Sequence, residues 1–204
     1  MKAMGRWEPD ARGRLLDAAV ELFTERGYDA TTAAQIAERA GLTKTTLFRH
    51  FADKREILFQ GQESLVVVAG DAVGSAPSGS APFEVLRAGV LAMCAMHDAG
   101  RRDLGRRLDA ILSSSAELQE RASFKRATIA AALHEALAAR LGDARQAGIL
   151  ADVGVRAYYD GFSSWIVASE DGPLADVVRA ELDAYALALV DLTSTTPAGA
   201  PALR

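Results

Sequence analysis

Hydrophobic residues recur every three or four positions along most of the chain, and no stretch alternates strictly between apolar and polar residues. This period is typical of amphipathic helices. The first such pattern runs from about residue 10 to 26, with Leu15, Leu16, Ala19, Leu22 and Phe23 on one stripe. Later patterns cover roughly 83–99, 103–115, 117–141, 145–170 and 174–192. The sequence therefore predicts an all-α protein of about nine helices.

Capping residues divide the start of the chain into short helices. Gly27 ends the first helix, because glycine readily adopts the positive φ that is common after a helix. Thr32 and Gln35 form a capping box that begins the second helix, and Thr43 caps the third. The third helix is expected to turn three apolar side chains inward, namely Leu47, Phe48 and Phe51.

A fourth helix is expected to begin at Asp53, where Glu56 completes another capping box, and to run to about Val73. The segment 74–82 is small and proline-punctuated, as in a linker or loop between two bundles. The predicted divisions are a helix-turn-helix domain of three helices over 1–55, a helical bundle for ligand binding and dimerisation over 56–193, and a disordered tail over 194–204.

The second and third helices have the pattern of a helix-turn-helix motif. Gly41 supplies the turn, Ala37 is small enough for the helix crossing, and three apolar residues close the core between the helices: Ile36, Leu42 and Leu47. In this motif the second helix enters the major groove of DNA. The segment that would do so, GLTKTTLFRHF over 41–51, contains no carboxylate.

The distribution of charge supports a local contact with nucleic acid. The chain has a net charge of −4, which argues against a protein that coats nucleic acid indiscriminately. Residues 1–60 hold 10 Lys/Arg and 9 Asp/Glu, whereas residues 61–204 hold 13 and 18. Within 39–55 there are five basic residues against one acidic residue. The positive charge is concentrated around the predicted motif.

The first 60 residues resemble the TetR family of transcriptional regulators. The resemblance rests on TTAAQIAERAGLTKTTLFRHFADKREILF over 31–59 and on the lead-in RLLDAAVELFTERGYDATT over 14–32. It implies a homodimer whose two recognition helices read a palindromic double-stranded DNA operator. It also implies a pocket for a small apolar or amphipathic effector in the C-terminal helices. The expected function is a ligand-responsive repressor that its effector releases from DNA.

The motif and the resemblance together give nine expected DNA-binding residues: Thr32, Thr43, Lys44, Thr45, Thr46, Phe48, Arg49, His50 and Lys54. Two of these positions depart from the family pattern. Phe48 lacks the hydroxyl of the tyrosine that is usual there, and Thr45 stands where glycine is frequent. The competing interpretation is a capped three-helix unit that serves only for packing.

Apolar and aromatic residues in the later helices are typical of an adaptable ligand site. The expected pocket residues are Val90, Met93, His97, Phe124, Tyr159, Phe162 and Trp165. The competing interpretation of each is an ordinary core residue. Gly161, in the middle of a helix, indicates that a neighbouring element or a ligand approaches closely.

The last helix carries an apolar stripe, and the family resemblance assigns this helix and the one before it to the dimer interface. The expected interface residues are Trp165, Val178, Leu182, Tyr185 and Leu189. The other side of this helix offers Ala180, Ala184 and Ala188, which are small enough for close helix approach. An intramolecular core explains the same stripe equally well.

Other classes of function find little support in the sequence. Cys94 and His97 supply at most two metal ligands, and no second pair follows. We expect no catalytic residue, no metal and no cofactor, because no known catalytic or phosphate-binding motif appears. A single cysteine and the lack of a long apolar run favour a cytoplasmic protein without a membrane partner. The alternative function is a small-molecule-binding or sequestering helical protein with a non-functional helix-turn-helix.

Overall fold

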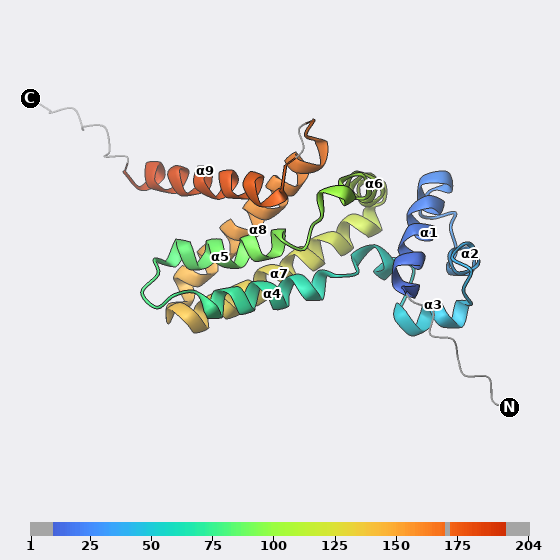
Figure 1. The fold of residues 1–204 in the computed structure, drawn as a ribbon, viewed down its shortest axis with the longest axis horizontal. Helices are drawn as coiled ribbons and strands as arrows, with labels where there is room; N and C mark the ends of the chain where they lie inside the picture. Colours follow the sequence, from blue (N-terminus) through green and yellow to red (C-terminus); the bar gives the residue numbers. More distant parts are fainter. Residues whose placement is uncertain (1–9, 170–171, 195–204) are drawn as a thin grey trace, which may run out of the picture. The chain divides into compact units, whose positions relative to one another are not determined.

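The computed structural model describes residues 10–169 and 172–194. Within these residues, every regular secondary-structure element is a helix (Figure 1). The α-helices are α1 (Ala11–Arg26), α2 (Ala33–Arg39), α3 (Lys44–His50), α4 (Gln62–Ser75), α5 (Pro82–Cys94), α6 (Arg102–Ser113), α7 (Ala116–Leu141), α8 (Ala144–Val167) and α9 (Leu174–Ser194). Two short 3-10 helices are η1 (Glu56–Phe59) and η2 (Ala99–Arg101). The prediction of an all-α fold is confirmed.

The chain forms two compact units. The first unit comprises the described residues up to Ser64 together with Arg101–Thr128, and the second comprises Leu65–Gly100 and the described residues from Ile129 onward. The first unit thus contains α6 and the beginning of α7 besides α1, α2 and α3. This grouping differs from the expected division at residue 55. The functions that were assigned to 1–55 and 56–193 stay predictions.

The core of the first unit is built around α1. Its buried residues Leu15, Ala19 and Leu22 pack with Ile36 of α2 and Leu47 of α3. Helices α6 and α7 add Ile111 and Leu118 to the same cluster. The helix-turn-helix is therefore supported by a core larger than three helices.

The fourth predicted helix is wrong in its extent. Asp53 Oδ1 accepts hydrogen bonds from the backbone N–H groups of Arg55 and Glu56, as expected of a cap. Only the short η1 follows, and α4 begins after Gly61, which has a φ of 88°. The side chain of Glu56 accepts from Arg121 and not from the cap, so the reciprocal capping box is absent.

The second unit packs α5, α8 and α9 with the later part of α7 around a core that includes Leu86, Met93 and Trp165. The loop 76–81 joins α4 to α5 inside this unit and does not link two bundles. Helix α9 includes Ser194, and the rest of the expected disordered tail, 195–204, lies outside the described residues.

Close approach at Gly161 of α8 explains why that position lacks a side chain. A Cβ atom placed there would lie 2.6 Å from Cγ2 of Val178 and 3.1 Å from its Cα atom. The approaching element is therefore α9, and the expectation of a close neighbour at Gly161 is confirmed.

Candidate nucleic-acid interface

The turn between α2 and α3 is fixed by local hydrogen bonds. Gly41 has a φ of 66°, which favours glycine, and the N–H of Leu42 donates to the carbonyl oxygen of Ala37 at 2.8 Å. Thr43 Oγ1 accepts from the N–H of Thr46 at 3.1 Å and begins α3. The three residues that were expected to close this core behave accordingly, with Ile36 and Leu47 fully buried and Leu42 half-buried.

Helix α3 has one buried and one exposed side. Leu47 and Phe51 point into the core of the first unit, where they are 0% and 4% exposed. Phe48 is 45% exposed, so the prediction that it faces inward is wrong. It shares the exposed side with Lys44, Thr45 and Arg49. The structure therefore brings four of the expected DNA-binding residues together on one accessible face.

Four of the five basic residues within 39–55 divide into two groups. Arg39 pairs with Glu21 and Glu25, and Arg55 pairs with Asp53 and Glu117. By contrast, Lys44 and Arg49 form no ion pair with any residue in 10–169 or 172–194. The ammonium of Lys44 lies 5.6 Å from the ring centroid of Phe48. Lys44 and Arg49 therefore offer a partner two cations on α3 that no carboxylate of the described residues neutralises.

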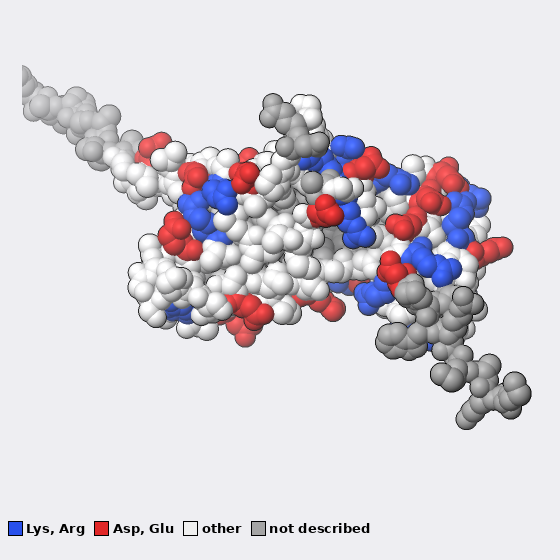
Figure 2. Space-filling model, viewed as in Figure 1, with Lys and Arg blue, Asp and Glu red and all other residues white. Residues whose placement is uncertain are grey.

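Figure 2 shows that acidic and basic side chains are interspersed over the face viewed there, without one large field of either sign. This distribution agrees with the net charge of −4. With a net charge of −4, a contact with polyanionic DNA is expected to depend on a small group of cations that lie close together.

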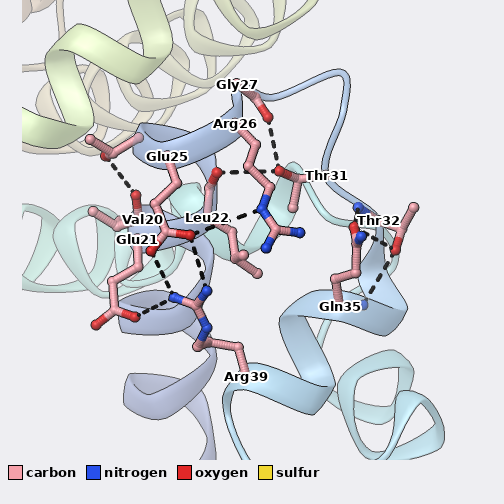
Figure 3. A network of polar contacts seen from close by, with 11 residues as sticks. Val20, Glu21, Leu22, Glu25, Arg26, Gly27, Thr31, Thr32, Gln35 and Arg39 are labelled. Carbon is pink, nitrogen blue, oxygen red and sulfur yellow. Dashed lines mark hydrogen bonds and ion pairs between the residues drawn. The ribbon is translucent and has the colours of Figure 1, made fainter.

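The preceding helix is clamped to α1 by Arg39, as Figure 3 shows. Its guanidinium donates to Glu25 at two oxygens, both at 3.0 Å, and to Glu21 at 3.0 Å. The hydrogen bond from Arg39 lowers the pKa of Glu25. This fork holds α2 in register with α1, and α2 in turn positions the turn before α3.

The loop between α1 and α2 is also tied down. Thr31 is 1% exposed and its hydroxyl donates to the carbonyl oxygen of Gly27 at 2.8 Å. Thr32 is exposed and forms the expected capping box, in which Gln35 Oε1 accepts from the backbone N–H of Thr32 at 2.9 Å. Thr32 therefore lies at the accessible start of α2, as the sequence predicted, and Thr31 is a structural residue that sequence reasoning missed.

Three further residues that were expected to contact DNA are half-buried within the chain. Lys54 Nζ donates to the carbonyl oxygens of Tyr28 and Thr31 at 2.7 and 2.9 Å. Thr46 is half-buried and its hydroxyl lies 2.9 Å from that of Thr43. His50 is half-buried, and its Nε2 atom has no hydrogen-bond partner among the described residues. The DNA contacts of these residues stay predictions.

A second polar cluster joins η1 to α7 within the first unit. Glu56 accepts from Arg121 Nε at 2.6 Å and from Lys125 Nζ at 3.2 Å. Burial would raise the pKa of Glu56, but the hydrogen bonds from Arg121 and Lys125 outweigh it and lower the pKa of this carboxyl. The same turn is held by Arg55, which donates to Glu117 at 3.1 Å.

Most of the expected pocket residues come together in the second unit. The His97 ring centroid lies 5.3 Å from that of Phe162 and 6.5 Å from that of Trp165. Val90 and Met93 belong to the same core and are fully buried. Tyr159 is half-buried and packs against this core.

The second unit also contains a partly buried polar pair that sequence reasoning did not assign. His97 Nε2 lies 2.6 Å from the hydroxyl of Tyr158, which is 3% exposed. Burial lowers the pKa of His97 and raises the pKa of Tyr158. These residues are 61 positions apart, and the sequence carries no signal of their contact.

Phe124 is not a member of this aromatic cluster. Its side chain is 60% exposed, and it belongs to the part of α7 that lies in the first unit. The guanidinium of Arg121 lies 5.1 Å from its ring centroid. The prediction that Phe124 lines the pocket is wrong, because its position on α7 turns the ring toward solvent.

The expected dimer interface also needs correction. Trp165, Val178 and Leu182 are 2%, 0% and 0% exposed within a single chain, so the intramolecular core explains them. Tyr185 is half-buried, and its hydroxyl donates to Asp160 at 2.6 Å. Only Leu189, at 37% exposure, remains accessible among the five. The other large apolar residues of α9 that are exposed are Leu187, Val190 and Leu192.

Neither a metal centre nor a membrane span is found in the described parts of the chain. Within residues 10–169 and 172–194, no group of three or more His, Cys, Asp or Glu side chains is arranged to hold a metal ion. In the same residues, no helix combines the length and the apolar character that crossing a membrane requires.

Residues 15–60 match the family described as bacterial regulatory proteins, tetR family, which confirms the resemblance expected from the sequence. The HTH-type transcriptional activator FasR of Mycolicibacterium smegmatis is 48% identical over 48 residues, which are 24% of this chain and 22% of that protein. The chain covers only 22% to 24% of the length of the first three curated relatives. The sequence similarity to these three relatives is therefore limited to a segment of 45 to 48 residues.

Solved structures extend the likeness of the fold to most of the chain. The SmeT–triclosan complex has a TM-score of 0.60 at 21% identity and covers 94% of this chain and 99% of that chain. The regulator FadR from Bacillus subtilis, in complex with stearoyl-CoA, has a TM-score of 0.55 at 18% identity and covers 84% of this chain and 95% of that chain. At these identities the likeness shows the fold alone.

Proposed function

Because residues 15–60 match the tetR family of bacterial regulatory proteins, we propose that this chain is a DNA-binding transcriptional regulator. It acts as a repressor that binds a palindromic operator as a homodimer and leaves it when a small molecule binds. The observation that carries this proposal is the exposed, carboxylate-free face of α3, where Lys44 and Arg49 are unpaired among the described residues.

The chemistry of this face suits the major groove. Cations that approach phosphates displace condensed counterions, and lysine or arginine can bind guanine O6 and N7. Thr45 adds a short side chain with a hydroxyl and a methyl group on the same exposed face. Leu47, on the buried side of α3, anchors the helix in the core of the first unit. The helix backbone that carries Lys44, Thr45 and Arg49 is therefore already ordered before DNA binds.

Three residues that were expected to touch DNA have a positioning role in this proposal. Lys54, Thr43 and Thr46 hold the ends of α3 and its neighbouring turns through the hydrogen bonds described above. Thr32 and His50 remain candidates for phosphate contacts at the edges of the groove. The direct base contacts belong to Lys44, Thr45, Phe48 and Arg49.

Dimerisation supplies the second recognition helix. The two α3 helices of a dimer would read half-sites about one helical turn apart, that is about 34–36 Å. The accessible side of α9, with Ala180, Ala184 and Leu187, offers small and apolar residues for contact with a second copy. The deeply buried residues of the same helix serve its own core.

The effector is an apolar or amphipathic small molecule that binds in the second unit. The supporting observation is the aromatic cluster around His97, which combines apolar surface with a polar pair. Two structures with the same fold hold such molecules, triclosan in one and stearoyl-CoA in the other. The effector weakens operator binding only by the difference between its affinities for the DNA-bound and the free state.

Selection from random double-stranded DNA tests the proposal. We expect enrichment of a palindromic site, and a Lys44→Ala/Arg49→Ala variant should bind it roughly 100-fold more weakly in a gel shift at moderate salt. The matched control Arg145→Ala/Arg179→Ala removes two exposed cations from the second unit and should bind like the wild type.

The same experiment decides between the two functions considered for this chain. If no sequence is enriched and the purified protein binds small apolar compounds, the sequestering function is correct and the regulator is excluded. Equal losses in the two double variants would contradict the assignment of the α3 face.

A further inference from the structure

The exposed side of α3 contains an aromatic ring where a polar helix surface would be expected. Phe48 is 45% exposed, although its neighbours Leu47 and Phe51 are buried. Together with Lys44, Thr45 and Arg49 it lines a shallow hollow on the surface of the first unit. The solvent-exposed ring of Phe48, with Lys44 and Arg49 near it, indicates a surface that a partner covers when it binds.

The geometry of the helix fixes this hollow. Residues three and four apart are neighbours on a helix, so Phe48 lies beside Thr45 and Lys44. The ring cannot turn into the core, because Leu47 and Phe51 already fill the inner side. The ammonium of Lys44, 5.6 Å from the centroid, borders the ring on one side. The hollow is therefore a preformed combination of an apolar floor and a cationic rim.

The edge of a base pair in the major groove presents one apolar group, which is the C5-methyl group of thymine. The other major-groove features are hydrogen-bond donors and acceptors, which a phenyl ring cannot satisfy. Phe48 has no hydroxyl with which to donate to a phosphate. The surrounding cations and the lack of a carboxylate over 41–51 favour a polyanion as the partner of this surface.

We infer that Phe48, with the methyl group of Thr45, contacts the 5-methyl group of a thymine in each operator half-site. This inference rests on the proposed function. Lys44 and Arg49 border this contact and bind base edges or phosphates beside it. The operator half-site therefore contains a thymine whose methyl group contributes to affinity, and this contribution depends on the ring at position 48.

The test replaces thymines of the selected operator one at a time by deoxyuridine, symmetrically in both half-sites. This change removes the methyl group and leaves the pairing and the other groove atoms in place. At one thymine position we expect affinity to fall about fourfold per methyl group, or about 16-fold for the two half-sites. A cytosine placed there should bind more weakly than 5-methylcytosine, which carries a methyl group at the same point of the groove.

Protein variants connect the methyl effect to the hollow. Phe48→Leu and Phe48→Ala should bind the thymine and deoxyuridine operators with nearly equal affinity, and Thr45→Ser should lose part of the difference. Arg49→Ala is the control, because it should weaken binding to both operators and keep their ratio. Circular dichroism and the thermal unfolding midpoint report whether each variant is folded, and Phe48 is exposed enough that little change is expected.

The outcomes separate the inference from the proposed function. An enriched operator with no methyl-dependent position, or a methyl effect that persists in both Phe48→Leu and Phe48→Ala, would overturn the inference and leave the regulator in place. Failure to select any DNA would overturn both. A methyl effect at one thymine per half-site that disappears with the ring would establish the contact.

Discussion

The Lys54 ammonium group is bound twice by Tyr28. Nζ donates to the Tyr28 carbonyl oxygen at 2.7 Å and lies 4.0 Å from the centroid of the tyrosine ring. A further hydrogen bond to the carbonyl oxygen of Thr31, at 2.9 Å, occupies a second proton. Lys54 therefore connects the segment after α3 to the loop between α1 and α2.

Replacing Lys54 by methionine keeps the length of the side chain and removes its donors. Two carbonyl oxygens would be left without their partner, so we expect the free energy of unfolding to fall by about 1–3 kcal/mol. Urea unfolding measures this change. The slope of log binding constant against log salt should stay as in the wild type, whereas Lys44→Ala should reduce it by about 0.9 for each phosphate that Lys44 neutralises. A reduced slope for Lys54→Met would instead assign Lys54 to a phosphate.

Among the carboxylates of the first unit, Glu56 is the one whose replacement is expected to lower the free energy of unfolding most. Glu56→Gln removes the partner of two cations, Arg121 and Lys125, that are both largely covered. We expect a loss of about 1–3 kcal/mol in the free energy of unfolding near neutral pH. Asp176→Asn is the control, since Asp176 pairs with Arg179 at an exposed site and its loss should change stability little.

The pH dependence of this effect has a definite sign. The pKa of Glu56 is lower in the folded chain than its ordinary value of 4.5, so the unfolded state binds more protons between those two values. The stabilisation is present above pH 4.5 and is lost as the pH falls toward the folded pKa. Consequently, the difference between wild type and Glu56→Gln should shrink on acidification below that value, and a constant difference would contradict the prediction.

Gly161 and Gly70 offer a matched pair of helical glycines. Gly161→Ala would place a methyl group 2.6 Å from Cγ2 of Val178 and 3.1 Å from its Cα atom, whereas Gly70 has open space around it. We expect Gly70→Ala to stabilise the protein by about 0.5–1 kcal/mol and Gly161→Ala to destabilise it by about 1–3 kcal/mol. Thermal unfolding of the two variants checks the signs, and a stabilised Gly161→Ala variant would show that α8 and α9 are separable there.

The elements that the sequence predicted well are those whose signals are local. The caps at Thr32 and Thr43 and the turn at Gly41 depend on a few neighbouring residues, and each appears as expected. Phe48 was misplaced because apolar character alone does not decide the side of a short helix. Leu47 and Phe51 are four apart and share the inner face, while Phe48 is turned by about 100° from Leu47.

Contacts between distant parts of the sequence could not be predicted. Glu56 and Arg121 are 65 positions apart, and neither stands in a pattern that names its partner. The apolar stripe of α9 likewise does not reveal which element covers it. Its period predicts that Val178 and Leu182 are buried, but it does not distinguish burial in the same chain from burial against a second copy.

The hydrogen-bonded pair of His97 and Tyr158 is expected to make the stability of the second unit depend on pH, because it places a titratable imidazole in a partly buried site. Burial lowers the pKa of His97 below its ordinary value of 6.5, so the unfolded state binds more protons between the two values. The contribution of His97 is therefore complete above pH 6.5 and is lost as the pH falls. Stability of the second unit should decrease on mild acidification.

His97→Gln keeps a polar partner for Tyr158 and removes the titration. We expect the free energy of unfolding of the wild type to fall more steeply than that of His97→Gln between about pH 7 and pH 5. Tyr158→Phe should cost about 1–2 kcal/mol at neutral pH, because it leaves His97 Nε2 without its hydroxyl partner. Urea unfolding at several pH values measures both effects. Parallel pH profiles for wild type and His97→Gln would mean that His97 is solvated well enough to titrate as it does in the unfolded chain.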